Sequence, residues 1–190
     1  GLLQRAAFRV DGQAARALLA NRVVMVTGAA GSIGSELCRQ IVRYQPQRIV
    51  LLDTNESGLY DLSVELTAKA PGLGVELCLC DIVNAGRLQA IFERTRPQII
   101  FHAAAYKHVP ILEAYPGEAI RVNVLGTRSL HRLARHYGVE RFILISSDKA
   151  VNPGNVLGLS KWLCELLVAS AAGEPMLSAT LLLPGDDTPI

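Results

Sequence analysis

The stretch VVMVTGAAGSIG, residues 23–34, decides the fold. It places three glycines, Gly28, Gly31 and Gly34, between an apolar segment and an amphipathic one. In a dinucleotide-binding loop the first glycine permits a sharp turn, the second lets the backbone approach a pyrophosphate, and the third lets a helix pack closely on a strand. The spacing is GxxGxxG rather than GxGxxG, and taken alone it fits an ordinary strand–helix turn equally well.

An acidic residue further along the chain strengthens the dinucleotide interpretation. Asp53 ends the next apolar segment, 19 residues after Gly34, where a carboxylate can accept hydrogen bonds from the hydroxyls of an adenosine ribose. The same negative charge would repel a 2′-phosphate, which favours NAD as the cofactor, with NADP as the alternative. Asp81 and Ile82 follow the third apolar segment, and Asp81 either contacts the adenine edge or caps the next helix.

Short apolar segments alternate with helix-length amphipathic segments along the chain. The strands that this rhythm predicts are residues 22–27, 48–53, 75–80, 98–102 and 141–146, with a sixth at 178–183. The predicted helices are residues 32–44, 57–69, 84–95, 116–137 and 156–171. Crossovers of that length require parallel pairing, so we expect an α/β fold with a doubly wound, Rossmann-like parallel sheet. Residues 1–21 are predicted to form a lead-in helix or linker, and residues 22–190 the NAD(P)-binding domain.

The composition of the chain excludes several classes of protein. Of 190 residues, 50% are hydrophobic and only 19% are charged, with a mean hydropathy of +0.27, which is typical of a folded core rather than of disorder. The net charge of +2 comes from scattered basic residues that never form a run, so no nucleic-acid partner is expected.

Membrane, export and metal functions are not expected either. The apolar stretches fall short of the roughly 20 residues that a membrane span requires, and no signal-peptide pattern begins the chain. We therefore expect a cytoplasmic protein with four reduced cysteines. These cysteines lack the spacing of a zinc site, which predicts packing roles and no metal.

Reactive side chains follow the fourth and fifth predicted strands. Ala103 and Ala104 end the fourth strand with small side chains that leave space for a cofactor at the mouth of the sheet. The fifth strand ends in SSDK, residues 146–149, which combines hydroxyls, an acid and a base. Catalytic groups gather at the carboxyl ends of strands in this architecture, so this segment is the predicted active site.

A lysine on the following predicted helix completes the expected site. Lys161 could hydrogen-bond a nicotinamide ribose and supply positive charge. Four residues earlier, one helical turn away, lies Leu157, which has no proton to exchange. Reversible alcohol oxidation by a tyrosine base at that position is therefore not expected.

Several segments resemble the CapD-like polysaccharide-biosynthesis family of nucleotide-sugar 4,6-dehydratases, within the extended short-chain dehydrogenases/reductases. They are VTGAAGSIGSELCRQI (26–41), LLDTNESGLYDL (51–62), FHAAAYKHVPILE (101–113), NVLGT (123–127) and ISSDKAVNP (145–153). The resemblance implies that the cofactor contacts Gly28, Gly31, Gly34, Asp53, Asp81, Ala103, Asn123 and Lys161. We expect it to contact Ser32, Ile33, Ile82, Ala104 and Ser146 as well. It places Ser147, Asp148 and Lys149 around the sugar, with Lys161 as the fourth catalytic residue.

The reaction that this resemblance implies removes water from a UDP-linked N-acetylhexosamine to give a 4-keto-6-deoxy sugar, with NAD+ as a recycled hydride carrier. Asp148 would protonate the leaving hydroxyl and Lys149 would take the proton at C5. Ser147 would either orient O4 or relay its proton in place of the absent tyrosine. The alternatives are a cofactor-binding fragment without turnover and a UDP-sugar epimerase or reductase. Family members continue for a further region that binds the nucleotide half of the substrate. We therefore expect the substrate domain to be largely missing, and the chain to bind cofactor with little dehydration.

The resemblance also implies self-association, since extended short-chain dehydrogenases commonly pair two helices from each copy. The corresponding helices lie near residues 123–137 and 156–171. The apolar surface of this homo-oligomer is predicted to consist of Leu130, Leu133, Leu163, Leu166 and Leu167.

Overall fold

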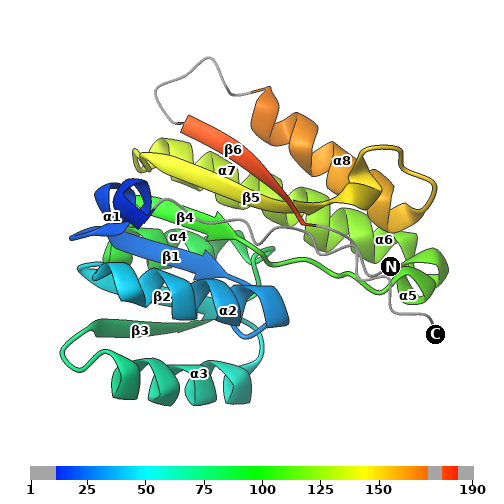
Figure 1. Ribbon diagram of the computed structural model, residues 1–190. Coiled ribbons are helices and arrows are strands. Elements are labelled where there is room, and N and C mark those ends of the chain that lie inside the picture. Colours follow the sequence, from blue (N-terminus) through cyan, green and yellow to red (C-terminus); the bar gives the residue numbers. More distant parts are fainter. Residues whose placement is uncertain (1–11, 171–176, 184–190) are drawn as a thin grey trace, which may run out of the picture.

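The computed structural model describes residues 12–170 and 177–183, which contain a six-stranded parallel sheet (Figure 1). Its strand order is β3-β2-β1-β4-β5-β6. The strands are β1 (Val23–Thr27), β2 (Arg48–Asp53), β3 (Gly74–Leu79), β4 (Ile99–His102), β5 (Arg141–Ser147) and β6 (Leu177–Leu183). The chain moves outward from β1 to β2 and β3 on one side, and then crosses to β4 on the other. This reversal leaves a crevice at the carboxyl ends of β1 and β4, where ligands bind in doubly wound sheets.

Helices cover both faces of the sheet (Figure 1). One face carries α1 (Gly12–Leu19), α2 (Ser32–Ile41) and α3 (Glu56–Lys69), and the other carries α4 (Ala85–Thr95), α7 (Thr127–His136) and α8 (Val156–Ala169). Shorter helical segments are η1 (Val42–Tyr44), α5 (Val109–Ala114), α6 (Pro116–Glu118), η2 (Ala119–Gly126) and η3 (Asp148–Ala150). The last four lie near the carboxyl ends of the strands or lead into the helices of the second face.

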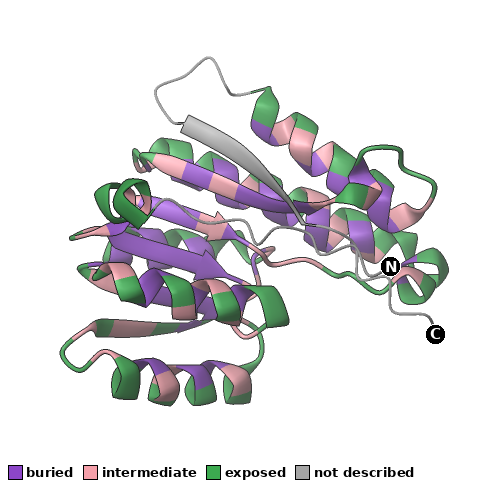
Figure 2. Ribbon diagram, viewed as in Figure 1, coloured by how far each residue is buried: buried purple, intermediate pink, exposed green. Residues whose placement is uncertain are grey.

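The core consists of two apolar clusters, one on each face of the sheet. Val24 and Val26 of β1 belong to the cluster beneath α2 and α3, whereas Met25 of the same strand belongs to the cluster beneath α4 and α7. The central strands are buried on both faces, as continuous apolar strands of a parallel sheet should be (Figure 2). The edge strand β3 differs, because Leu77 and Leu79 remain exposed.

The predicted fold class is confirmed, and every strand lies within one residue of its expected bounds. Two helix predictions are wrong in detail. The segment 116–137 is not one α-helix, because it passes through the π-helical turn η2, where the Asn123 carbonyl also accepts side-chain hydrogen bonds from Thr127 and Cys164. The segment 32–44 ends in the 3₁₀ turn η1, which stops at Gln45 in the left-handed conformation.

The sequence reasoning also missed α5. This helix has only six residues, too few to show a clear apolar period. Its signal was Pro110 in the first turn, a position that proline favours.

A buried histidine joins both halves of the sheet to α7. His102 Nδ1 lies 2.7 Å from the Thr27 hydroxyl of β1, and its Nε2 lies 2.8 Å from the Thr127 hydroxyl of α7. Thr127 donates its only hydroxyl proton to the Asn123 carbonyl at 2.5 Å. It must therefore accept from Nε2–H, and Thr27 must donate to Nδ1. Burial, with the nearby charges of Lys161 and His131, lowers the pKa of His102 to about 3, so the ring is neutral.

We expect His102 to make the fold less stable in acid. Its pKa falls from 6.5 to about 3 on folding, so below about pH 6.5 the unfolded chain binds a proton that the folded chain does not. The contribution of His102 to the free energy of unfolding is complete above about pH 6.5. It is lost as the pH falls from there to about 3, at up to about 1.4 kcal/mol per pH unit. Urea unfolding between pH 4 and 7 measures this slope. The slope should be reduced in His102→Gln and unchanged in the exposed control His136→Gln; equal slopes in all three proteins would contradict the assignment.

Candidate functional site

A cavity of about 520 Å³ lies at the carboxyl ends of β1 and β4, within the range of about 300–1,000 Å³ that small-molecule sites occupy. Its walls come from the loop after β1, the ends of β2 and β3, and the segment after β4. The lining residues are Gly28, Ala30, Gly31, Ser32, Ile33, Gly34, Leu52, Asp53, Thr54, Asn55, Cys80, Asp81, Ile82, Ala103, Ala104, Ala105, Tyr106, Lys107, His108 and Val122. The cavity therefore lies in the crevice that the strand order creates.

The turn between β1 and α2 is closed by two glycines. Gly28 has a φ of +69°, and a Cβ on it would lie 2.6 Å from the Ala104 nitrogen, so only glycine fits between the two loops. A Cβ on Gly34 would overlap the Gly28 carbonyl. These contacts bring the first turn of α2 directly onto the end of β1.

The amino-terminal end of α2 has free donors beside the cavity. Its first helical bond runs from Ser35 N to Gly31 O at 2.9 Å, so the N–H groups of residues 32–34 have no helical acceptor. No side chain caps this end, whereas asparagine side chains cap α3, α4 and α8. The positive end of the helix dipole and the ammonium of Lys107, which donates to Ser32 Oγ at 3.3 Å, add positive charge. This end of the cavity fits a phosphate group.

The carboxylate of Asp53, at the end of β2, also lines the cavity. Its Oδ2 accepts a hydrogen bond from Ala30 N at 2.9 Å, and its Oδ1 accepts from Thr54 N at 2.7 Å and Asn55 N at 3.0 Å. A carboxylate offers about four acceptor sites, so one remains for a ligand hydroxyl. Asp53 thus braces the glycine loop while facing the cavity.

Asp81 also faces the cavity, and it is not a helix cap. Asn84 caps α4 instead, accepting a hydrogen bond from Arg87 N. Asp81 Oδ1 accepts from Val83 N at 3.1 Å, and its Oδ2 lies 3.6 Å from the Arg121 guanidinium. The capping alternative for Asp81 is therefore wrong.

The cavity brings together most of the cofactor residues that the sequence suggested. They are Gly28, Gly31, Ser32, Ile33, Gly34, Asp53, Asp81, Ile82, Ala103 and Ala104. The other three suggested residues, Asn123, Ser146 and Lys161, do not line it, and neither do Ser147, Asp148 and Lys149. Lys107 was missed, although it follows the alanine-rich end of β4 in the segment HAAAYKHVP.

Asn123 is buried and supports the cavity wall from behind. Its Oδ1 accepts from Tyr106 N at 2.8 Å, and its Nδ2 donates to Tyr106 O at 3.1 Å and to Ser160 Oγ at 3.0 Å. The amide therefore fixes the backbone of Tyr106, which is a lining residue. Through that contact Asn123 also positions Lys107, the next residue.

Lys161 and Ser146 are buried beneath the end of β5. Lys161 Nζ donates to the Ile145 carbonyl at 2.9 Å, and burial lowers the pKa of this ammonium from its usual value. Ser146 Oγ donates to the Glu165 carboxylate at 2.5 Å. Both side chains tie β5 to α8, so α8 has a fixed position against the carboxyl end of the strand.

The segment after β5 forms a compact turn of polar groups. Ser147 Oγ donates to Asp148 Oδ1 at 3.0 Å and accepts from Lys149 N at 3.2 Å. Asp148 is exposed and Lys149 is half-buried. A Cβ on Gly158 would overlap the Lys149 carbonyl, so this glycine lets η3 rest on the first turn of α8. Gly158 was missed because nothing local in the sequence reveals that approach.

Leu157 is buried at 5% exposure in a small apolar cluster with Leu112 and Ala119. The side chain that precedes Lys161 by one turn thus stabilises the junction of α5, η2 and α8. It offers no hydroxyl to the site.

All four cysteines are buried free thiols. Across residues 12–170, no group of three or more His, Cys, Asp or Glu side chains could ligate a metal ion. Among the helices that the structure describes, none combines the length and the hydrophobicity that a membrane-spanning helix needs.

The model of the family described as "polysaccharide biosynthesis protein" matches residues 24–182. The chain belongs to this family. It is 43% identical over 154 residues to the capsular polysaccharide biosynthesis protein CapD of Staphylococcus aureus, covering 80% of this chain and 26% of CapD. This family member is also 29% identical over 149 residues to UDP-N-acetylglucosamine 4,6-dehydratase (inverting) of Campylobacter jejuni, covering 78% of this chain and 43% of that protein.

The fold recurs in solved structures of nucleotide-sugar enzymes. The UDP-Glc/GlcNAc 4-epimerase of Campylobacter jejuni superposes with a TM-score of 0.78 at 24% identity, over 85% of this family member and 53% of that chain. At that identity the similarity shows the fold alone. This family member thus spans about a quarter of CapD and about half of the epimerase.

Proposed function

We propose that this chain is the NAD-binding part of a nucleotide-sugar 4,6-dehydratase that acts on a UDP-linked N-acetylhexosamine. One observation carries the proposal: the uncapped amino-terminal end of α2 and the Asp53 carboxylate face the same cavity. A dinucleotide carries an anionic pyrophosphate next to a ribose with two hydroxyl groups, which matches a helix end that attracts anions beside a carboxylate that accepts hydroxyls. The similarity to CapD and to the C. jejuni dehydratase supports the substrate class.

The residues of the cavity fit NAD better than NADP. The N–H groups of Ser32 and Ile33 would bind the pyrophosphate, and the remaining acceptor site of Asp53 would bind a ribose hydroxyl. A 2′-phosphate at that position would lie beside a carboxylate. Among the lining residues Lys107 carries a positive side chain, but it lies at the α2 end beside Ser32 rather than beside Asp53.

The turn after β5 would carry out the proton transfers. NAD+, when bound, would supply a hydride acceptor for C4 of the sugar and return the hydride at C6. Asp148, exposed at the end of β5, would protonate the leaving C6 hydroxyl, and Lys149 would take the proton from C5. Ser147, whose hydroxyl donates to Asp148 and accepts from Lys149 N, would orient O4 and relay the proton that O4 loses to the Asp148 carboxylate, and Asp148 would then pass this proton to the leaving C6 hydroxyl. Lys161 would hold the nicotinamide ribose with the N–H groups that Ile145 leaves available.

Two other functions are compatible with the same cavity, a nucleotide-sugar epimerase and a cofactor-binding module without turnover. An epimerase would reach the same 4-keto stage without losing water, and the solved epimerase shares the fold. A cofactor-binding module would bind NAD without turnover, which the exposure of Asp148 favours, because water then has free access to the catalytic turn.

We predict that Gly31→Val abolishes NAD binding and leaves the chain folded. Gly31 is exposed with a φ of −73°, and a Cβ on it would lie 3.2 Å from the Gly28 carbonyl, so a side chain needs only a small adjustment. The valine would, however, stand where the pyrophosphate must approach the backbone. Calorimetric titration with NAD+ should show a loss of at least about 100-fold in affinity, or about 2.7 kcal/mol.

The matched control is Gly86→Val, in the first turn of α4, where no atom lies within 4 Å of the new Cβ. It should bind NAD+ like the unmodified chain. If a folded Gly31→Val variant bound NAD+ as tightly as the unmodified chain, the assignment of the phosphate-binding loop would be wrong.

Incubation of the chain with NAD+ and UDP-N-acetylglucosamine, followed by mass spectrometry, tests the reaction. We expect slow loss of one water from the sugar, abolished in Asp148→Asn, since the amide cannot donate a carboxyl proton. A C4 epimer of unchanged mass would favour the epimerase. Bound NAD+ with neither product would favour the binding module.

We further propose that two copies associate through α8. The expected use of Leu130 and Leu133 is wrong, because both are buried in the core beneath α7. The exposed apolar side chains of α8 are Leu159, Trp162 and Leu166, which recur every three or four residues on one face of the helix. Light scattering should show a dimer that Leu166→Glu dissociates, and a monomer at high concentration would exclude this interface.

A further inference from the structure

A second cavity, of about 590 Å³, lies between α7 and α8, apart from the dinucleotide cavity. Three arginines and two histidines make up most of its lining. The lining residues are Arg128, His131, Arg132, Arg135, His136, Leu167 and Ser170. None of them belongs to the site described above.

The basic residues share one face of α7. Arg128, Arg132 and Arg135 are separated by four and three residues, so their side chains are neighbours on the helix surface. The sequence Thr127–His136 contains three arginines, two histidines and no acidic residue. Because these residues are interleaved with apolar ones, the sequence shows no basic run, and only the helix brings them together.

This arrangement places like charges side by side, and a bound anion would reduce their repulsion. Like charges four residues apart on a helix repel each other. The helix dipole favours positive charge in the last turn of α7, near Arg135 and His136, but not at Arg128 and Arg132. Within residues 12–170 no carboxylate forms an ion pair with Arg128 or Arg132.

The acidic residue of α8 does not compensate for these charges. Glu165 is the acidic residue of that helix, and it accepts the hydroxyl of Ser146 at the end of β5. His131 also lines the cavity, and its ring lies edge-on to that of Phe142, with the ring centroids 5.0 Å apart. Burial, and then the charge of Arg135, lowers the pKa of the His131 imidazole, so the arginines carry the positive charge near neutral pH.

We propose that the cavity between α7 and α8 binds a soluble ligand through a phosphate or diphosphate group. Guanidinium groups donate pairs of parallel hydrogen bonds that match phosphate oxygens. The basic residues line an open depression of about 590 Å³ between two helices, a volume that accommodates a compact anion. Leu167, half-buried at its edge, would contact an apolar part of the ligand.

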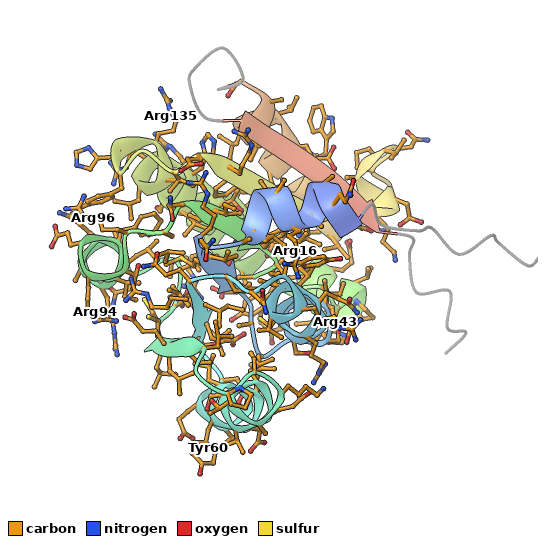
Figure 3. The ribbon with its side chains drawn as sticks, turned by 60° about the vertical axis from the view of Figure 1, so that its left-hand side comes forward. Arg16, Arg43, Tyr60, Arg94, Arg96 and Arg135 are labelled. Atoms are coloured by element: carbon orange, nitrogen blue, oxygen red, sulfur yellow. The ribbon has the colours of Figure 1, made fainter. Side chains whose placement is uncertain are left out.

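Calorimetric titration with inorganic pyrophosphate tests the proposal. The double variant Arg128→Gln/Arg132→Gln removes two exposed charges without altering the core. The matched control Arg16→Gln/Arg43→Gln removes two exposed charges elsewhere, and Figure 3 shows both of those side chains well away from Arg135. Thermal melting followed by circular dichroism checks that each variant is folded. We expect the unmodified chain to bind pyrophosphate, the first variant to lose at least tenfold in affinity, and the control to stay within twofold.

Pyrophosphate could also bind at the glycine loop, and Gly31→Val separates the two sites. Binding that survives Gly31→Val and is lost in Arg128→Gln/Arg132→Gln supports the proposal. No binding to the unmodified chain, or binding lost only in Gly31→Val, overturns it. A third arm uses vesicles of phosphatidylglycerol and phosphatidylcholine. Vesicle binding that depends on Arg128 and Arg132, without pyrophosphate binding, would replace the soluble ligand by a membrane and also overturn the proposal.

Discussion

The rest of the site depends on the direct contact between Gly34 and the carbonyl of Gly28. A Cβ at Gly34 would overlap that carbonyl, so α2 can begin directly over the end of β1 only because residue 34 carries no side chain. That approach leaves the first N–H groups of α2 without acceptors beside the cavity. The same turn brings Ala30 N within 2.9 Å of the Asp53 carboxylate, so the uncapped end of α2 and the Asp53 carboxylate are fixed relative to each other.

A second network of hydrogen bonds connects this turn to α7 and η2. His102 joins Thr27, the residue before Gly28, to Thr127 of α7. Thr127 in turn bonds the carbonyl of Asn123, whose amide fixes Tyr106 in the cavity wall. Neutral, buried hydrogen bonds of this kind are costly to leave unmade. The walls from β1, β4 and η2 are therefore expected to keep one relative position.

The sequence alone predicted the features that depend on local patterns. The strand bounds, the glycine turn and the position of Asp53 beside it each depend on residues that are close together in the sequence. The inward orientation of Asn123 could not be predicted, because the π-helical turn η2 shifts the face that each residue presents. Leu130 and Leu133 were assigned to an interface, but both lie in the core. The apolar residues on one face of a helix do not show whether that face packs against the core or against a partner. The role of Gly158 depends on its contact with the Lys149 carbonyl, and the basic cavity depends on how α7 and α8 pack. Neither could be predicted from local sequence.

A crystal structure of the chain soaked with NAD+ tests the central claim most directly. The account predicts density in the cavity at the ends of β1 and β4, with a ribose hydroxyl on the Asp53 carboxylate and the pyrophosphate on the N–H groups of Ser32 and Ile33. An empty cavity at saturating NAD+, or a dinucleotide bound elsewhere on the chain, would contradict it.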